Sequence, residues 1–566
     1  MTDFSEFAQV CQKIEKIPGS IETTSIISDF LAQIDDDELY IVAHFIRGKV
    51  FPQWSDLEPG IGPNLLYMAI ARTAGIKVPD VKNMVRDLGD IGAAARDSLK
   101  KKTQVSFSAF FKEESSINIK DVYSRFSDIA TSSGRGSQSA KIRNLQYLFS
   151  NVSPEEAVYI SRLAVEELRI GVGEGLVRDA IAKAFNVDTE LVERGYMLTN
   201  DLGTVALTAR KEGAKGLSNL NIKINRPIKM MLAQIAESIE SAVLDIGEVA
   251  VEWKFDGARV QIHKDYDQIT LYSRRLENVT SSLPELVKKL KQAVGAEQVI
   301  LDGEVVAVGR NGKPMPFQQL LRRFRRKYDI QQMQEEIPLT LNLFDIMYIN
   351  GRSLIDLPLT ERRKILAVHI QNIEGLTLAE QNITGDTGTI QRIYESALSA
   401  GHEGVMLKNP SSLYTPGKRG KNWLKIKPIM ETLDLVVVGG EWGEGRRAHL
   451  IGSYTLACLD TENNTHLYVG KVGTGIDDKQ LKELTLSFKQ LVITEKGKEL
   501  QFEPRIVFEI AYEEIQKSSN YSAGYALRFP RFLGVRADKS PQDADTIERV
   551  EQLYIKQGTI YIYHEK

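Results

Sequence analysis

The sequence predicts a chain of several domains: an all-α N-terminal part, an α+β middle part with antiparallel sheets, and a C-terminal β-barrel. Its 566 residues allow roughly three or four domains of about 150 residues each. Apolar residues recur at the helical spacing of three and four up to about residue 215. From about residue 245 apolar and polar residues alternate instead, and after residue 431 the strands become short and evenly spaced. We therefore expect domains at 1–215, 216–430 and 431–566.

The composition excludes several classes of protein. Hydrophobic residues make up 42% and charged residues 26%, which is typical of a globular protein. No run reaches the roughly 18 apolar residues that a membrane span needs, and the N-terminus lacks the pattern of a signal peptide. Two cysteines, Cys11 and Cys458, are too few for a disulfide framework or a cysteine-based zinc site, so we expect a reducing, cytoplasmic compartment. The net charge of 72 − 75 = −3 gives no sign of a nucleic-acid partner.

The N-terminal part contains a repeat. Its helical periodicity is clearest in Glu38–Ile46, Asn64–Ala74 and Pro154–Leu168. Gly60–Ile76 aligns with Gly171–Val187, and both passages predict a glycine-containing turn followed by a helix. The second glycine-rich turn follows a helix rather than a strand, so it does not predict a dinucleotide-binding fold. Backbone amides at such a helix start could bind a DNA phosphate instead.

Alternating segments define the middle and C-terminal parts. A helix is expected after Ser282, with Ser282 and Glu285 as its capping box. The predicted strands of the middle part are 248–255, 259–265, 268–275, 299–308 and 339–349. Those of the C-terminal part are 433–442, 452–460, 466–473 and 505–515, a pattern that suits a small closed barrel.

Lys254 is the candidate nucleophile. It stands at the end of a predicted strand, between Trp253 and Phe255, where an amine can be partly desolvated. An attacking amine must be uncharged, whereas a free lysine with a pKa of about 10.4 is neutral in only about one molecule in a thousand near pH 7.5. Desolvation and neighbouring cations favour the neutral form, and Lys425 and Lys427 are the candidate cations.

Six short motifs follow one another between Lys254 and Lys539. The first is K-x-D-G-x-R, matched by Lys254, Asp256, Gly257 and Arg259. The other five motifs match Ser273–Asn278, Leu301–Val306, Glu403–Lys408, Trp423–Lys427 and Arg528–Lys539, and the segment Leu343–Tyr348 offers Phe344 between the third and the fourth. These motifs, in this order, resemble those of ATP-dependent DNA ligases of the archaeal and eukaryotic replicative type, within the covalent nucleotidyltransferases. The helical N-terminal part is similar to the DNA-binding domain of that family, so the resemblance covers essentially the whole chain.

The resemblance implies a role for each matched residue. Lys254 would carry the adenylate, and Glu304 and Glu403 would bind Mg²⁺, with Glu304 also accepting from the ribose. Glu252 would contact the edge of adenine, and Phe344 would stack on its face. The residues expected to hold the sugar and phosphates are Arg259, Arg274, Arg419, Lys425 and Lys427. Arg536, Asp538 and Lys539 would orient the leaving pyrophosphate, carried on a C-terminal OB-fold.

The implied reaction is the sealing of nicks in duplex DNA, through a lysyl-AMP and a DNA-adenylate, in replication, repair and recombination. ATP would be the adenylate donor and Mg²⁺ the metal. The resemblance further implies a monomer near the nucleoid of an archaeal cell, with a sliding clamp as a further partner. Gln33–Glu38 is not a convincing clamp-binding motif.

Other functions compete with this one. An RNA capping guanylyltransferase and an RNA ligase share the nucleotidyltransferase motifs, but neither is expected to carry this helical N-terminal part. An NAD-dependent ligase would need a cysteine-bound zinc module, and a catalytically inactive DNA-binding protein need not keep all six motifs. Two basic segments, Lys408–Lys427 and Leu321–Lys327, are candidates for contact with DNA phosphates.

Overall fold

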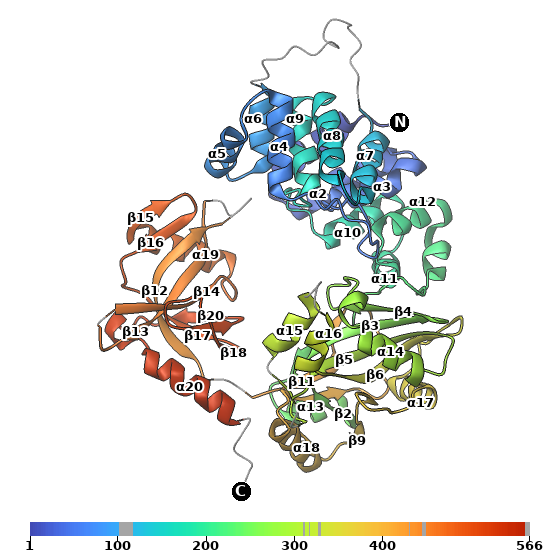
Figure 1. Ribbon diagram of the computed structural model, residues 1–566, viewed down its shortest axis with the longest axis vertical. Coiled ribbons are helices and arrows are strands. Elements are labelled where there is room, and N and C mark those ends of the chain that lie inside the picture. Colours follow the sequence, from blue (N-terminus) through green and yellow to red (C-terminus); the bar gives the residue numbers. More distant parts are fainter. Residues whose placement is uncertain are drawn as a thin grey trace, which may run out of the picture.

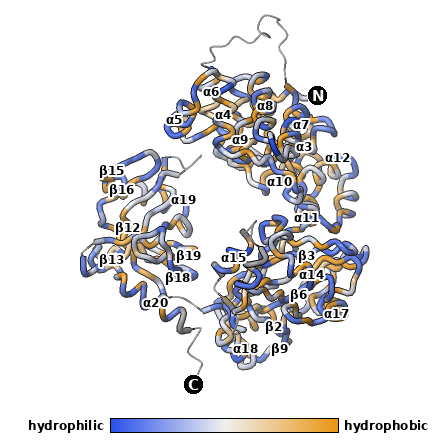
Figure 2. Tube along the Cα trace, viewed as in Figure 1, coloured by the Kyte–Doolittle hydropathy of each residue, from blue (hydrophilic) through white to orange (hydrophobic). Residues whose placement is uncertain are grey.

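The computed structural model describes residues 1–100, 117–309, 312–315, 317–325, 330–428, 431–443, 449–463 and 465–560. It has three parts, coloured blue to green, green to yellow and orange to red along the sequence (Figure 1). Hydrophobic and hydrophilic residues intersperse along the helices and strands of all three (Figure 2), as amphipathic elements around separate cores require. Within the described residues, no helix is long and apolar enough to cross a membrane.

The helical part is confirmed as all-α in the described residues. Its helices are α1 Phe4–Glu15, α2 Ser20–Gln33, α3 Asp36–Ile46, α4 Pro63–Ala74, α5 Val78–Leu88, α6 Ile91–Lys100, α7 Ile119–Thr131, α8 Ser137–Ser150, α9 Pro154–Ala164, α10 Glu174–Ala184, α11 Thr189–Thr199 and α12 Leu202–Asn219. The expected repeat is present, because Gly60 (φ 55°) and Gly171 (φ 70°) both adopt the left-handed conformation shortly before α4 and α10 begin.

In the part of the chain that the structure describes, the central part contains two β-sheets. One has the strand order β1-β11-β10-β2-β9, and the other has the order β4-β3-β5-β6-β7, with β8 beside β6. The strands are β1 Leu232–Ile235, β2 Val249–Lys254, β3 Ala258–Asp265, β4 Gln268–Ser273, β5 Gln298–Ala307, β6 Leu339–Ile349, β7 Arg352–Ser353, β8 Leu376–Leu378, β9 Asn382–Thr384, β10 Gly404–Lys408 and β11 Arg419–Ile426. Although β2 and β3 follow one another in the chain, they belong to different sheets, so the turn between them crosses from one sheet to the other.

Six α-helices of the described residues complete the central part: α13 Ile239–Ile246, α14 Pro284–Ala293, α15 Phe317–Arg325, α16 Ile330–Glu336, α17 Leu359–His369 and α18 Thr387–Ser399. The expected capping box of α14 is wrong. The helix starts at Pro284, and its N-cap residue, Leu283, makes no side-chain cap bond. Ser282 instead donates to the carbonyl of Phe324, and Glu285 pairs with Arg323, so tertiary contacts take both side chains.

The C-terminal part is rich in strands, as expected. It contains β12 Leu433–Trp442, β13 Ile451–Asp460, β14 Thr465–Val472, β15 Val492–Lys496, β16 Glu499–Phe502, β17 Val507–Ala511, β18 Glu514–Lys517, β19 Tyr525–Arg528, β20 Arg531–Val535 and the helices α19 Asp478–Lys489 and α20 Ile547–Ile560. In the described residues the strand pairing does not close into a ring, which corrects the expectation of a closed barrel. The single strand expected over 505–515 is broken between β17 and β18, beside Glu513.

Ion pairs join the parts. Lys229 and Lys418 of the central part contact Glu174 and Glu193 of the helical part, at 3.2 and 2.8 Å between nitrogen and oxygen. The C-terminal part contacts the central part through a 2.7 Å pair between Lys427 and Glu513. α12 ends at Asn219, a few residues beyond the limit of 215 expected for the first domain.

Candidate active site

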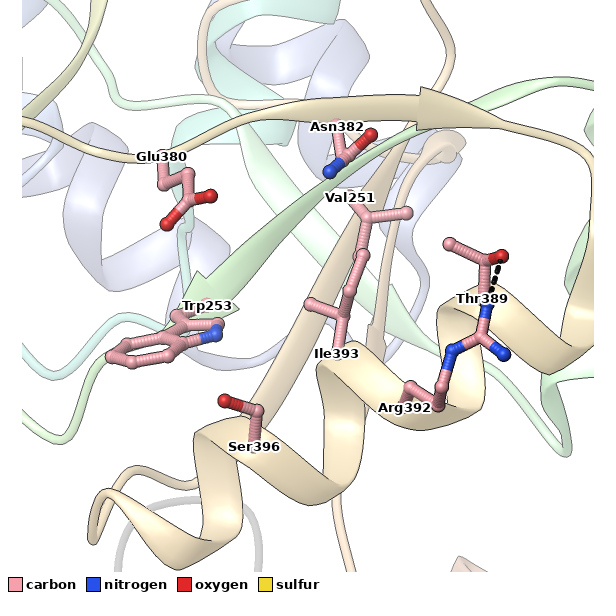
Figure 3. A pocket seen from close by; sticks show the side chains of 8 residues that line it. All are labelled: Val251, Trp253, Glu380, Asn382, Thr389, Arg392, Ile393 and Ser396. Atoms are coloured by element: carbon pink, nitrogen blue, oxygen red, sulfur yellow. Dashed lines mark hydrogen bonds between the residues drawn. The ribbon is translucent and has the colours of Figure 1, made fainter.

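Strand β2 presents two different faces. Val249 and Val251 are buried against α13 and α18, in a cluster that also includes residues of β10 and β11. Val251 and Trp253 line a cavity of about 220 Å³ with side chains of β9 and α18 (Figure 3). Because side chains alternate along a strand, Glu252 and Lys254 lie on the opposite face, toward the second sheet. The alternating pattern of the sequence therefore separates a structural face from a polar one.

The amine of Lys254 meets the carboxylate of Glu403. The two form an ion pair, and the backbone N–H of Glu403 donates to the carbonyl of Lys254 at 3.0 Å. This contact follows from strand register, since Gly404 is paired with Lys254 across β10 and β2. The side chain of Lys254 is 18% exposed, so the amine is partly desolvated but accessible.

Gly257 allows the turn after Lys254 to lie against β5. A Cβ atom at this position would stand 2.5 Å from the carbonyl oxygen of Val305 and 2.8 Å from Cγ of Glu304. Both distances are shorter than real Cβ contacts, so only glycine fits. The close approach brings Glu304 of the second sheet to the turn that carries Lys254. Arg259, two residues further along, is paired in register with Glu304.

Several ionisable groups around this turn have shifted pKa values. Burial raises the pKa of Glu304 to about 8; the charges of Lys254 and Arg259 oppose this shift, and that of Glu403 adds to it. Burial, with the charges of Glu403 and Glu514, raises the pKa of Asp256 to about 7. Burial and neighbouring carboxylates thus disfavour the ionised forms of Glu304 and Asp256, a condition that a divalent cation would relieve.

Lys425 lies in β11, and Lys427 lies directly after the end of this strand. Register pairs Glu252 with Met406 and Met406 with Lys425, so Lys425 shares a face with Glu252 and Lys254. Burial, followed by the charges of Lys254 and Lys427, lowers the pKa of Lys425. The structure therefore brings together the candidate nucleophile, its two candidate carboxylates and the two candidate lysines.

The C-terminal part contributes to this region. A cavity of about 60 Å³ beside Asp256 and Glu403 is lined by Lys427 and by four C-terminal residues, Glu513, Glu514, Arg528 and Gln557. A volume of this size holds water but not a nucleotide, whose sites are typically about 300–1,000 Å³. In this arrangement Glu513 engages Lys427, and the charge of Lys427 lowers the pKa of the Glu513 carboxyl below its usual value, against the effect of burial.

A second group of predicted residues is also buried here. Glu252 is 3% exposed and pairs with Lys408. The ammonium of Lys408 lies 4.5 Å from the ring centre of Phe344, which is itself only 8% exposed. Arg259 is held by a 2.6 Å ion pair with the buried carboxylate of Asp302 and by the carbonyl of Met231. The structure thus places Glu252 and Phe344 together, whereas Arg259 is engaged by protein groups.

Other predicted residues stand apart from Lys254. Arg274 and Arg419 are exposed, at the end of β4 and the start of β11. Arg536 and Lys539 both contact Asp434 of the C-terminal part, at 2.8 and 2.6 Å, and Arg536 also pairs with Asp538. In this arrangement these three residues of the sixth motif therefore form ion pairs within the C-terminal part.

The basic segments require a correction. In Lys408–Lys427, Lys408 is buried with Glu252 and does not face DNA, whereas Lys418 and Lys421 pair with protein carboxylates but stay exposed. In Leu321–Lys327, Arg323 is 1% exposed and pairs with Glu285, so it does not face DNA. Residues 326 and 327 lie outside the described part of the chain.

Sequence reasoning missed three residues of the site. Asp302 anchors Arg259, Lys408 pairs with Glu252, and Glu513 reaches Lys427 from another domain. Asp302 and Lys408 both lie within recognised motifs, and an acidic or basic residue in an otherwise apolar strand is the signal that could have identified them. Nothing in the sequence around Glu513 indicated its contact.

The two facing sheets, with a lysine at the crossing turn and the motifs in their order, define the class of covalent nucleotidyltransferases. Family models narrow this class. Those described as DNA ligase N terminus, ATP dependent DNA ligase domain and ATP dependent DNA ligase C terminal region match residues 3–182, 230–427 and 447–539. The chain belongs to the family of ATP-dependent DNA ligases.

Full-length relatives agree with this assignment. The chain is 56% identical over 566 residues to a DNA ligase of Methanococcoides burtonii, covering 98% of this chain and 100% of that protein. It is 52% identical over 552 residues to a DNA ligase of Archaeoglobus fulgidus, with 97% and 98% covered. A solved structure described as Pmar-Lig_Pre is 20% identical, with a TM-score of 0.57 and 94% and 99% coverage, and supports the fold alone. The protein is thus an enzyme that seals DNA nicks with ATP as adenylate donor.

We expect Glu304→Gln to stabilise the ligand-free protein more at high pH than at low pH. Because the pKa of Glu304 in the folded state, about 8, lies above the ordinary value, the folded state binds its proton more tightly. The resulting stability is complete at low pH and is lost as the pH rises toward about 8. Glutamine does not titrate, so the melting temperature of the variant relative to the unaltered protein should rise between about pH 5.5 and about pH 8.5.

Thermal unfolding followed by circular dichroism, without ATP or Mg²⁺, measures this difference. Glu503→Gln serves as the control, because Glu503 is a surface residue that pairs with Arg505 within the C-terminal part. An equal shift of the Glu304→Gln melting temperature at both pH values would contradict the prediction.

Proposed function

We propose that Lys254 is the residue that carries AMP in the ligase reaction. The observation that supports this most is the convergence of Glu403, Glu304 and Lys425 on one lysine at the crossing turn between two sheets. The Nζ atom would attack the α-phosphorus of ATP, forming a P–N bond while the bond to the β-phosphate oxygen breaks and pyrophosphate leaves. The ammonium must lose its proton before or during this attack.

Glu403 has two successive tasks in this proposal. In the ligand-free protein its carboxylate forms an ion pair with the amine of Lys254, so Nζ is held by a protein group. When the carboxylate turns toward the metal, Nζ of Lys254 loses this partner and is free to approach the α-phosphorus. Nucleotide binding would thus activate the lysine by removing its anionic partner.

We infer that Mg²⁺ is the metal and that Glu403 and Glu304 are its protein ligands. In the described residues, no group of three acidic, histidine or cysteine side chains is arranged to hold a metal ion. Two carboxylates with substrate phosphates and water suit Mg²⁺, which is rarely bound by protein groups alone. The raised pKa of Glu304 fits such a site, because a cation there would favour the ionised carboxylate. The metal would supply neutralisation of the charge on the phosphates.

The adenylate would then pass through two further displacements. The 5′-phosphate oxygen at a nick attacks the phosphorus of lysyl-AMP, the P–N bond breaks, and a DNA-adenylate forms. The 3′-hydroxyl next attacks the 5′-phosphorus, loses its proton and expels AMP, which seals the strand. Each step is an in-line displacement that gains mainly from positioning and charge stabilisation.

The remaining residues take the roles that their chemistry suits. We propose that Glu252 contacts adenine and Phe344 stacks on it, and that the sugar and phosphates are bound by Arg259, Arg274, Arg419, Lys425 and Lys427. Asp256 would hold the C-terminal part near the turn. Arg536, Asp538 and Lys539 would orient pyrophosphate only after the C-terminal part turns toward the nucleotide. Domain limits of 1–215, 216–430 and 431–566 fit such a movement.

Glu513 is expected to weaken ATP binding. It engages Lys427, one of the candidate phosphate ligands, so the nucleotide must compete with it. We expect Glu513→Gln to tighten ATP binding about two- to fivefold, the range for a partly exposed ion pair. A titration of ATP in the presence of EDTA, which blocks adenylation, measures the dissociation constant. Glu503→Gln should leave it unchanged, and an unaltered or weaker affinity in Glu513→Gln would refute this role.

For partners, we propose that the protein acts as a monomer near the nucleoid and binds a sliding clamp. Gln33–Glu38 is a poor clamp motif, since Glu38 is buried and accepts from the backbone N–H of Thr2. Size-exclusion chromatography with and without a clamp tests both the monomer and the complex.

One experiment tests the proposed reaction as a whole. The protein is incubated with α-labelled ATP and Mg²⁺, and the labelled residue is identified by mass spectrometry. Nicked duplex DNA is then added. We expect the label to reside on Lys254 and to leave the protein as sealed DNA appears. Label on another residue, or label that persists while DNA is sealed, would exclude this mechanism; label from GTP alone would favour a capping enzyme.

A further inference from the structure

Glu252 is held from both sides by neighbouring strands. Its Oε2 accepts from Nζ of Lys408 at 2.5 Å, and its Oε1 accepts from Nε2 of Gln381 at 2.7 Å. The positions follow from register: β2 lies between β10 and β9, and the pairing of Val251 with Asn382 places Gln381 beside Glu252. Each oxygen of the carboxylate thus has its own donor, and the two donors together fix the orientation of the group.

The two donors differ in what else they can do. The ammonium of Lys408 is 2% exposed and lies 4.5 and 4.4 Å from the ring centres of Phe344 and Trp423. The two rings hold the ammonium by cation–π contacts, and its positive charge balances the negative charge of the buried Glu252. Gln381 is neutral and partly exposed, so it is not needed to balance charge. Its hydrogen bond instead fixes the position of Oε1 of Glu252.

We propose that Gln381 is a positioning residue that makes Glu252 select a 6-amino purine over a 6-oxo purine. The inference rests on the proposed role of Glu252 at the edge of adenine. An ionised carboxylate only accepts hydrogen bonds, and the 6-amino group of adenine donates, whereas the 6-oxo group of inosine or guanosine also accepts. A carboxylate that cannot turn away imposes repulsion between two acceptors, which rejects the wrong base.

Without Gln381, the Glu252 side chain keeps only one donor and gains freedom to rotate. The carboxylate would then be less well oriented to accept a hydrogen bond from adenine. It could also turn away from the oxygen of a 6-oxo base. Loss of the Gln381 side chain should therefore reduce the preference for adenine over a 6-oxo base. It should have little effect on the reaction of Lys254 with the phosphate at the other end of the nucleotide. A site that forms a hydrogen bond with an amino group of the correct substrate rejects analogues that lack this group, so its loss lowers selectivity.

The test compares ATP with inosine triphosphate, which differs from it at the 6-position and at the adjacent ring nitrogen. The second-order rate of Lys254 labelling is measured with each donor on full-length Gln381→Met. We expect the preference for ATP over inosine triphosphate to fall about tenfold relative to the unaltered protein. Because both rates come from one preparation, a loss of correctly folded protein cancels in their ratio.

The matched control is Asn382→Ala. Asn382 is the next residue, but it lines the cavity on the opposite side of β2 with Val251 and Trp253 (Figure 3), so its loss should leave the preference unchanged. An unchanged preference in Gln381→Met, or the same fall in Asn382→Ala, would overturn the inference. Failure of the unaltered protein to label Lys254 with ATP would instead refute the proposed function, so the two failures are distinguishable.

Discussion

Lys254→Ala protein will take up no label from α-labelled ATP, and its sealing of nicked DNA with ATP will fall by about 10⁴-fold or more, the order expected when a covalent nucleophile is removed. The physical reason is that alanine offers no atom that can form the P–N bond. The fold should persist, because the lysine side chain is not part of a hydrophobic cluster and it forms its ion pair with the partly exposed Glu403.

Two measurements separate the loss of the nucleophile from general damage. Lys254→Ala should still bind nicked duplex DNA and should still join a nick that already carries the adenylate, because that step does not need the lysine adduct. Lys364→Ala provides the control: Lys364 lies in α17 of the same part, is well exposed and pairs with Glu361. Labelling that survives in Lys254→Ala would mean that another residue is the nucleophile.

Gly257→Ala should slow the labelling of Lys254 about a hundredfold while leaving the protein folded. The added Cβ would meet the backbone oxygen of Val305 at 2.5 Å and Cγ of Glu304 at 2.8 Å, so the turn must move away from β5. A displacement of about 1 Å between reacting groups can reduce a rate by about this factor. The rate of label uptake, together with the melting temperature, measures the effect.

Gly388→Ala is the matched control for this substitution. Gly388 lies in the first turn of α18, and a Cβ there would be 3.7 Å from its nearest neighbours, an ordinary contact. It should label at the rate of the unaltered protein. If Gly257→Ala also labelled within about threefold of that rate, the close approach of the turn to β5 would not matter for catalysis.

Local sequence was enough for much of the fold. The helical period predicted α3 and α4 within a residue or two, and alternation predicted β3, β4 and β6. The glycine repeat predicted two turn-and-helix units, because a left-handed residue before a helix favours glycine. The failures occurred where local and distant contacts compete. Ser282 and Glu285 match a capping box, but Phe324 and Arg323 offer them partners that the local pattern does not reveal.

The candidate site divides in the same way. The motif around Lys254 could be recognised from consecutive residues, and so could the carboxylates at 304 and 403. The meaning of the basic segments could not, since Lys408 and Arg323 are buried with acidic partners from other elements. Charge in a sequence gives the number of cations and anions, but only the folded chain decides which of them neutralise one another.

By itself, the sequence determined the three-part architecture, the order of the motifs and the identity of the candidate nucleophile, because these depend on residue type and short spacing. Only the tertiary structure decided that the turn at Asp256–Gly257 passes between two sheets, that Gln381 flanks Glu252, and that Glu513 engages Lys427. These contacts join residues far apart in the chain, and strand pairing and domain packing, rather than local preference, determine which of them meet.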